Sequence, residues 1–347
     1  MITTINHEAE RLLGWTKEEL KGKELHSIIP IADELGNTLN TDEKPSFAAL
    51  SSGHSIIISS NSIKTFFYER KNHSFFPVAI SAVPIFVKGK IVGAINSFRD
   101  ITIERNIDKA KSEFVSLAAH QLRTPLTSIN WYTELLTERA NHLEPEEQKK
   151  FIMIVKKSAR RLTELINTLL NVSRIESGSV PFEPSPTNVI QCMKQVINGM
   201  APQIKKKKLT IKEFYRPEKL IISADPKILY IVFENILSNA VKYTPANGTI
   251  RISILKLKNQ YIVTIQDSGC GIPAYQQNKI FEKFFRADNV KTMDTDGTGL
   301  GLYMVRSILN ASDGKIWFES KENKGTTFHV SLPLAGIKKR EGTKPLV

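Results

Sequence analysis

The chain has 347 residues, enough for two or three domains, and its 41% hydrophobic and 24% charged residues are ordinary for a globular protein. Lysine and arginine number 48 against 35 acidic residues, which gives a net charge of +13. No apolar run approaches the roughly 18 residues of a membrane span, and the first residues lack the apolar core of a signal peptide. This composition predicts a cytoplasmic chain.

The positive charge gathers in two runs, Lys205–Lys208 and Lys338–Arg340. Such runs can attract nucleic acid, membranes or acidic proteins, but here no aromatic residues interleave with them and no helix-turn-helix pattern is present. We therefore predict solvated basic surfaces and no nucleic-acid partner. The two cysteines, Cys192 and Cys270, form no CxxC pair, so neither a disulfide framework nor a thiolate zinc site is expected.

Residues 1–103 mix helical and strand-like patterns. A helical stretch opens at residues 41–45 and stops at Gly53. Two β-rich runs, 75–83 and 91–99, flank a short polar break with a glycine, which is typical of a hairpin. This segment is predicted to form an α/β domain.

Residues 104–180 are predicted to be helical nearly throughout, with a break at 141–145 and a stop at Ser177-Gly178. In the second helix, a coiled-coil seam recurs at alternating steps of four and three residues: Phe151, Val155, Ser158, Leu162, Leu165, Leu169 and Val172. The first helix carries another stripe: Val115, Ala118, Leu122 and Ile129. One such hairpin alone would leave apolar surface in water, so two hairpins are predicted to pair into a four-helix bundle.

His120 lies in the middle of the first helix. At about 100° per residue, it is roughly 200° from Ala118 and Leu122, so its side chain should face solvent as a free, nucleophilic imidazole. Pro125 cannot donate to the carbonyl of Gln121, which predicts a kinked or loosened helix beside the histidine. A plain surface histidine is the alternative for this residue alone.

Residues 187–335 alternate helices and strands and carry four spaced motifs. In the first, Asn235, Asn239 and Lys242 share one helix face, followed by Tyr243; amide oxygens can ligate Mg²⁺ and an ammonium can pair with phosphate. In the second, Asp267 follows a strand and precedes Gly269 and Gly271. A buried carboxylate there can accept the exocyclic amine of adenine.

The third motif, Phe281–Arg286, opens a polar stretch that we interpret as a mobile lid, with Arg286 able to pair with a γ-phosphate. The fourth runs from Gly297 through Thr298, Gly299 and Leu300 to Gly301, before an apolar helix whose first N–H groups would favour an anion. It lacks the GK[ST] ending of a P-loop. Residues 336–347 are predicted to form a disordered polar tail.

The sequence HQLRTPL at His120 resembles the H-box of sensor histidine kinases of the HisKA class. The resemblance implies that His120 is the phospho-acceptor on a dimeric hairpin and that Thr124 positions a water in phosphatase chemistry. The family usually carries an acid where this chain has Gln121, and an amide cannot act as a general base. We therefore expect slower autophosphorylation.

The four motifs downstream, with Gly325-Thr326-Thr327-Phe328, resemble the N, G1, F and G2 boxes and the closing strand of the ATPase superfamily that histidine kinases share with DNA gyrase and mismatch-repair ATPases. The resemblance implies an α/β sandwich. It also implies that Asn235 and Asn239 hold Mg²⁺, that Lys242 and the 297–301 loop bind the phosphates of ATP, that Tyr243 lines the pocket, and that Asp267 binds adenine.

Residues 1–103 resemble a PAS domain through Leu13-Gly14-Trp15 and the closing Asp100-Ile101-Thr102, although the first strand of that fold is not visible before Ile5. The full expectation is a multidomain α+β chain: a PAS-like sensor (1–103), a dimerising phosphotransfer hairpin (104–180), a catalytic ATP-binding domain (187–335) and a tail (336–347).

The activity that these resemblances imply is that of a two-component sensor histidine kinase, which phosphorylates His120 with ATP and passes the phosphate to an aspartate of a response-regulator receiver domain. The expected assembly is a homodimer, cytoplasmic or the cytoplasmic portion of a membrane-anchored sensor, with membrane contact only through segments upstream. Two alternatives stay open: a phosphatase-biased regulator with weak kinase activity, and a conformational ATPase of the gyrase type that would not need His120.

Overall fold

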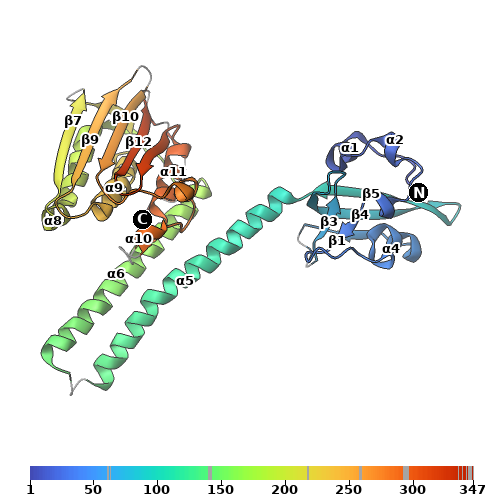
Figure 1. Ribbon diagram of the computed structural model, residues 1–347, viewed down its shortest axis with the longest axis horizontal. Helices are drawn as coiled ribbons and strands as arrows, with labels where there is room; N and C mark the ends of the chain where they lie inside the picture. The colour runs from blue at the N-terminus through green and yellow to red at the C-terminus, as the bar shows by residue number, and fades with distance from the viewer. Residues whose placement is uncertain are drawn as a thin grey trace. The chain divides into compact units, whose positions relative to one another are not determined.

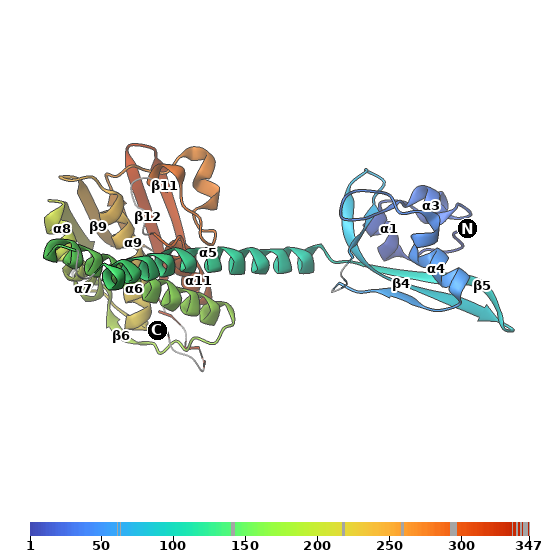
Figure 2. The ribbon, with the colours of Figure 1, turned by 90° about the horizontal axis from the view of Figure 1, so that it is seen from below.

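The computed structural model describes residues 1–60, 62, 64–139, 143–216, 219–257, 260–291, 297–334, 336–337, 339–340, 342 and 346. It divides into two compact units, Met1–Val115 and Ser116–Val347 (Figures 1 and 2). The predicted hairpin and catalytic segments therefore fall largely within one unit, while the long helix α5 (Thr102–Glu138) begins in the first unit and ends in the second.

The first unit is built on a five-stranded antiparallel sheet around the long strand β4. One edge of β4 pairs with β5 along its length, and the other edge pairs first with β3 and then with β2. Short helices complete the unit, and its core is centred on Leu13, Leu20, Tyr68 and Phe76. The elements are α1 (His7–Leu13), α2 (Lys17–Leu20), α3 (Leu25–Ile28), β1 (Ile31–Ala32), η1 (Thr41–Glu43), α4 (Pro45–Ser52), β2 (Ile56–Ile58), β3 (Phe66–Glu69), β4 (Phe75–Val87) and β5 (Lys90–Asp100).

The predicted hairpin and helix of this unit are both confirmed. Strands β4 and β5 are joined by Lys88 and Gly89, whose φ angles of 49° and 78° give the left-handed turn that suits a two-residue hairpin. Helix α4 starts with a proline and ends at Gly53, which adopts a left-handed conformation and closes the helix.

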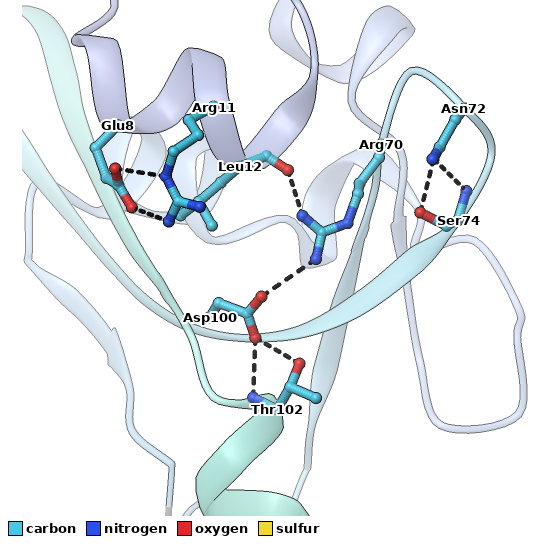
Figure 3. Close-up of polar contacts among 8 residues, drawn as sticks. All are labelled: Glu8, Arg11, Leu12, Arg70, Asn72, Ser74, Asp100 and Thr102. Atoms are coloured by element: carbon cyan, nitrogen blue, oxygen red, sulfur yellow. Dashed lines mark hydrogen bonds and ion pairs between the residues drawn. The ribbon is translucent and has the colours of Figure 1, made fainter.

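Asp100, at the end of β5, connects the sheet to helix α5 (Thr102–Glu138) (Figure 3). One carboxylate oxygen accepts the backbone N–H and the hydroxyl of Thr102 at 2.9 and 2.5 Å, and thereby satisfies the first backbone N–H of the helix, which has no partner within it. The other carboxylate oxygen accepts a hydrogen bond from Arg70 at 3.2 Å, and the same guanidinium donates to the carbonyl of Leu12. Arg70 therefore links the end of α1 to the start of α5.

Helices α5 and α6 (Pro145–Glu176) form the predicted hairpin, and the rings of Tyr132 and Phe151 pack between them at 5.2 Å. The stop after α6 is confirmed, because Gly178 has a φ of 71°. Residues 140–142, which include the first two residues of the predicted break at 141–145, lie outside the described residues. Helix α5 is continuous through Pro125, and Val115 of the predicted stripe is 58% exposed in the single hairpin. The kink beside His120 and the burial of this stripe in a four-helix bundle stay predictions.

The rest of the second unit is an α/β sandwich with a mixed sheet, as predicted. Its strands lie in the order β11-β12-β10-β9-β7; β7 and β9 are parallel and the other pairs are antiparallel. Helices α7, α9 and α11 pack together over the sheet (Figures 1 and 2). The elements are β6 (Ser185–Asn188), α7 (Val189–Gly199), α8 (Ala201–Lys206), β7 (Thr210–Arg216), β8 (Ile221–Ala224), α9 (Pro226–Tyr243), β9 (Thr249–Lys256), β10 (Gln260–Asp267), η2 (Ala274–Lys279), α10 (Asp288–Lys291), α11 (Gly301–Ala311), β11 (Lys315–Lys321) and β12 (Gly325–Pro333).

The predicted tail is ordered in part. Ile337 is 3% exposed and its N–H donates to the carbonyl of Ser223, while Arg340 pairs through its backbone with Phe182 and lies over that ring. A polar composition suggested disorder, but Ile337 has an apolar site in which to bury its side chain. Residues 335, 338, 341, 343–345 and 347 lie outside the described residues. Within the described ranges, no helix is both long and apolar enough to cross a membrane.

Candidate active site

A pocket of about 310 Å³ opens in the second unit where the end of α9, the end of β10 and the start of α11 meet. It brings together most of the residues that the nucleotide motifs predicted: Asn235, Asn239, Lys242, Tyr243, Asp267, Gly271, Arg286, Gly297, Thr298, Gly299 and Gly301. Two predicted residues lie behind the wall instead. Leu300 is fully buried, and Gly269 donates its N–H to Asp267.

Helix α9 presents four of these side chains because its opposite face is buried. Asp225 caps its start by accepting the N–H groups of Lys227 and Ile228, and Pro226 occupies the first turn. The Asn235 amide donates to a backbone carbonyl one turn earlier, which directs its oxygen toward Gly301. A Cβ at position 301 would lie 2.5 Å from that oxygen, so only glycine leaves the amide in place.

Asp267 is the buried acceptor of the pocket. It is 8% exposed, and one carboxylate oxygen accepts the N–H groups of Gly269 at 2.8 Å and Thr326 at 3.2 Å. Within the part of the chain that the structure describes, no hydrogen bond reaches the second oxygen. Burial raises the pKa of this carboxyl to about 6, against the opposing effect of the two backbone N–H groups. The free oxygen suits an amine donor from a ligand.

The start of α11 supplies the positive end of the pocket. Its N-cap residue, Leu300, makes no capping hydrogen bond through its side chain, and Gly297, Thr298, Gly299 and Gly301 all line the cavity. The first N–H groups of a helix lack partners within the helix, and the helix dipole favours an anion beside them. A phosphate chain fits this end of the pocket.

Arg286 holds the two flanks of the predicted lid. Its guanidinium donates to the carbonyl of Gly297 at 3.1 Å and to that of Val290 at 3.4 Å. Residues 292–296, the middle of that lid, lie outside the described residues. The backbone contacts therefore give Arg286 a role in shaping the pocket mouth, besides the phosphate contact that the sequence suggested.

Several lining residues escaped the sequence analysis. Thr326 lies in the predicted closing-strand motif, but nothing in the sequence indicated that its N–H would donate to Asp267. Cys270 lies between two predicted glycines, and burial raises its pKa. Glu164 and Thr168 reach the pocket from α6, and only the folded chain reveals them.

The predicted phospho-acceptor lies on α5 and does not line the pocket. His120 is exposed, as its helical phase predicted, and Gln121 beside it is half-buried. The hydroxyl of Thr124 donates to the carbonyl of His120 over 3.5 Å, one turn further along. This segment thus presents an imidazole to solvent with a hydroxyl nearby.

Three family models match the chain in sequence. A PAS domain model matches residues 1–102, the His Kinase A (phospho-acceptor) domain matches 110–178, and the histidine kinase-, DNA gyrase B- and HSP90-like ATPase matches 224–336. The phospho-acceptor match contains the exposed His120, and the ATPase match contains most of the residues that line the pocket.

Two curated relatives align with nearly the whole chain. The sensor protein kinase WalK of Staphylococcus haemolyticus is 28% identical over 337 residues, covering 96% of this chain and 52% of the relative. A WalK of Staphylococcus aureus is also 28% identical, over 96% of this chain and 75% of its own length. The chain therefore spans about half the length of the first of these curated relatives.

Two solved structures share the fold. The histidine kinase ThkA, in complex with the response regulator protein TrrA, matches 96% of this chain and 92% of its own with a TM-score of 0.52 and 23% identity. The Acinetobacter baumannii histidine kinase AdeS matches 62% of this chain and 98% of its own, with a TM-score of 0.52 and 20% identity. The chain therefore carries a PAS domain, a His Kinase A phospho-acceptor domain and a histidine kinase-, DNA gyrase B- and HSP90-like ATPase domain, in that order.

Proposed function

We propose that this chain binds ATP in the α9–α11 pocket, phosphorylates His120 and then passes the phosphate to an aspartate of a response-regulator receiver domain. The observation that carries the proposal is the convergence of Asp267, the α9 amides and the uncapped start of α11 on one pocket. In this proposal, the second oxygen of Asp267 accepts the adenine amine, and the phosphates extend toward α11 and Lys242.

Asn235 and Asn239 are the proposed Mg²⁺ ligands, since both amides line the phosphate end of the pocket. A bound Mg²⁺ would neutralise phosphate charge there. The His120 lone pair forms the N–P bond while the γ-phosphorus bond to the bridging oxygen breaks and ADP leaves. The remaining ring proton passes to solvent, because the Gln121 amide cannot accept it. Transfer onward breaks the N–P bond and forms an acyl phosphate on the receiver aspartate.

The test is incubation of the chain with γ-labelled ATP and Mg²⁺. Protein-bound label that is lost in acid and retained in alkali is the expected result, because a phosphohistidine N–P bond has that stability. ATP binding without any protein label would contradict autophosphorylation. The second half of the proposal is tested by adding a receiver domain and following loss of label from the chain.

Gln121 favours a second candidate function, a phosphatase-biased regulator. With no acid beside His120, autophosphorylation loses general-base assistance, while Thr124 retains a hydroxyl close to the histidine backbone. We expect Gln121→Glu to raise the rate of autophosphorylation, by about tenfold or more, in a single-turnover labelling assay. The same rate in both proteins would show that position 121 does no base catalysis here.

The pH dependence of nucleotide binding should report Asp267. Its pKa of about 6 means that the carboxyl takes up a proton as the pH falls through that value and loses its acceptor for the adenine amine. From about pH 7 to about pH 5, the dissociation constant for ATP should rise about tenfold. The profile is measured by calorimetry. Because the phosphates of ATP titrate in the same range, Asp267→Asn is the reference, and parallel profiles would contradict the assignment.

A homodimer is proposed from the apolar surface that one hairpin leaves in water. The exposed side chains come from both helices: Leu126, Trp131, Ile152, Met153, Ile166 and Leu170. Pairing two hairpins would bury them in a four-helix bundle. Light scattering at micromolar concentration should give twice the chain mass, and the mass of a single chain would contradict the proposal.

A further inference from the structure

The last turn of α9 is closed in an unusual way. The helix ends at Tyr243, and the next residue, Thr244, is extended and precedes a proline, so no left-handed glycine closes the helix. The Ala240 carbonyl accepts the N–H and the hydroxyl of Thr244 at 3.1 and 2.6 Å. The following carbonyls, of Val241 and Lys242, need a donor from elsewhere in the chain.

Lys207 is that donor. Its ammonium lies 2.7 Å from the Lys242 carbonyl oxygen and 3.0 Å from those of Val241 and Thr244, so three protons meet three acceptors. A cation at the C-terminal end of a helix also interacts favourably with the helix dipole.

The backbone of Lys207 is fixed as well. Its N–H donates to the Gln203 carbonyl at the end of α8, and its own carbonyl accepts the N–H of Asn247 at 2.9 Å. Lys207 is half-buried, whereas its neighbours Lys205 and Lys206 are exposed. One member of the basic run therefore differs from the solvated charges that the sequence predicted.

The turn that Lys207 holds forms part of the pocket wall. Lys242 and Tyr243 both line the cavity. The Tyr243 carbonyl accepts the N–H of Cys270 at 3.4 Å, and a Cβ at Gly269 would lie only 2.6 Å from the same oxygen. The end of α9 and the loop after Asp267 are thus packed backbone against backbone, and a shift of one must move the other.

We propose that Lys207 is a positioning residue of the nucleotide site: its ammonium fixes the last turn of α9 and, through Tyr243, the loop that places Asp267. This inference rests on the proposed function, since it assigns Lys207 to the same ATP pocket. Lys207 does not line the pocket, so its effect on the nucleotide is transmitted by backbone atoms.

The test compares ATP dissociation constants of the full chain and of Lys207→Met, which keeps the aliphatic stem and removes the donors. Affinity should fall about tenfold or more, because charge-assisted hydrogen bonds on three carbonyls are lost. Lys205→Met and Lys206→Met remove the same charge nearby and should stay within about twofold. Lys207→Arg, which keeps charge and donors, should recover much of the affinity.

To separate positioning of the nucleotide site from a loss of overall stability, ATP binding is measured well below the melting temperature of each variant. Circular dichroism confirms that each variant is folded. If folded Lys207→Met, or Lys207→Gln should the first variant not fold, binds ATP as tightly as the parent chain, the inference is overturned while the proposed function stands. If the parent chain itself does not bind ATP, the proposed function fails and the inference with it.

Discussion

The His120→Ala variant is expected to bind ATP like the parent chain and to carry no acid-labile label after incubation with γ-labelled ATP. The imidazole is exposed, does not line the pocket and makes no contact that stabilises the hairpin among the described residues. Alanine has the highest helix propensity, so α5 should persist. Loss of label with unchanged ATP affinity would therefore report the missing nucleophile and not a damaged fold.

The same variant separates the kinase from a conformational ATPase. His54→Ala, which removes another exposed histidine, is the control and should keep its label. If His120→Ala hydrolyses ATP as fast as the parent chain and the parent chain carries no label, the nucleotide pocket drives a conformational cycle instead. Label that persists on His120→Ala would place the acceptor at another residue.

Asp267→Asn is expected to weaken ATP binding by about 100-fold or more. One carboxylate oxygen already accepts two backbone N–H groups, so the amide must keep its oxygen there and turn its NH₂ toward the adenine amine. Two donors then face each other in a buried site. GTP carries a carbonyl at that ring position, so its affinity should fall less and the preference for ATP should shrink.

Calorimetric titration of both nucleotides measures this prediction. Asp225→Asn is the matched control: it changes a buried carboxylate of the same domain outside the nucleotide pocket, and asparagine remains a good N-cap for α9. Its ATP affinity should stay within about twofold of the parent chain. An Asp267→Asn variant that kept its affinity and its preference for ATP would remove Asp267 from adenine recognition.

The features that could be predicted from the sequence are those that neighbouring residues determine, namely helix faces and a hairpin turn. Helical phase placed His120 in solvent, and spacing placed Asn235, Asn239 and Lys242 on one face of α9, because a 3.6-residue period fixes side-chain direction. The turn between β4 and β5 could be predicted as well, since its positive φ angles favour glycine.

Contacts through space were not predictable in this way. Glu164 and Thr168 come to the pocket only because α6 packs near it, and a seam pattern gives no sign of that. In the sequence, nothing separates Lys207 from the other members of the four-lysine run. Its distinct role depends on the end of α9, which lies beside it only in the folded chain. Ile337 was assigned to a polar tail because its burial depends on a partner segment more than 100 residues earlier, at Ser223.

Cys270 gives the chain a built-in chemical reporter of pocket occupancy. It is half-buried in the pocket wall. Cys192, the other of the two cysteines, is buried, and burial raises its pKa to about 11. Alkylation needs the thiolate and access to it, so Cys192 should stay unmodified whether or not the pocket is filled. The rate at which iodoacetamide modifies Cys270, read by mass spectrometry against that internal reference, then measures how often the pocket is vacant in the chain without any engineered label.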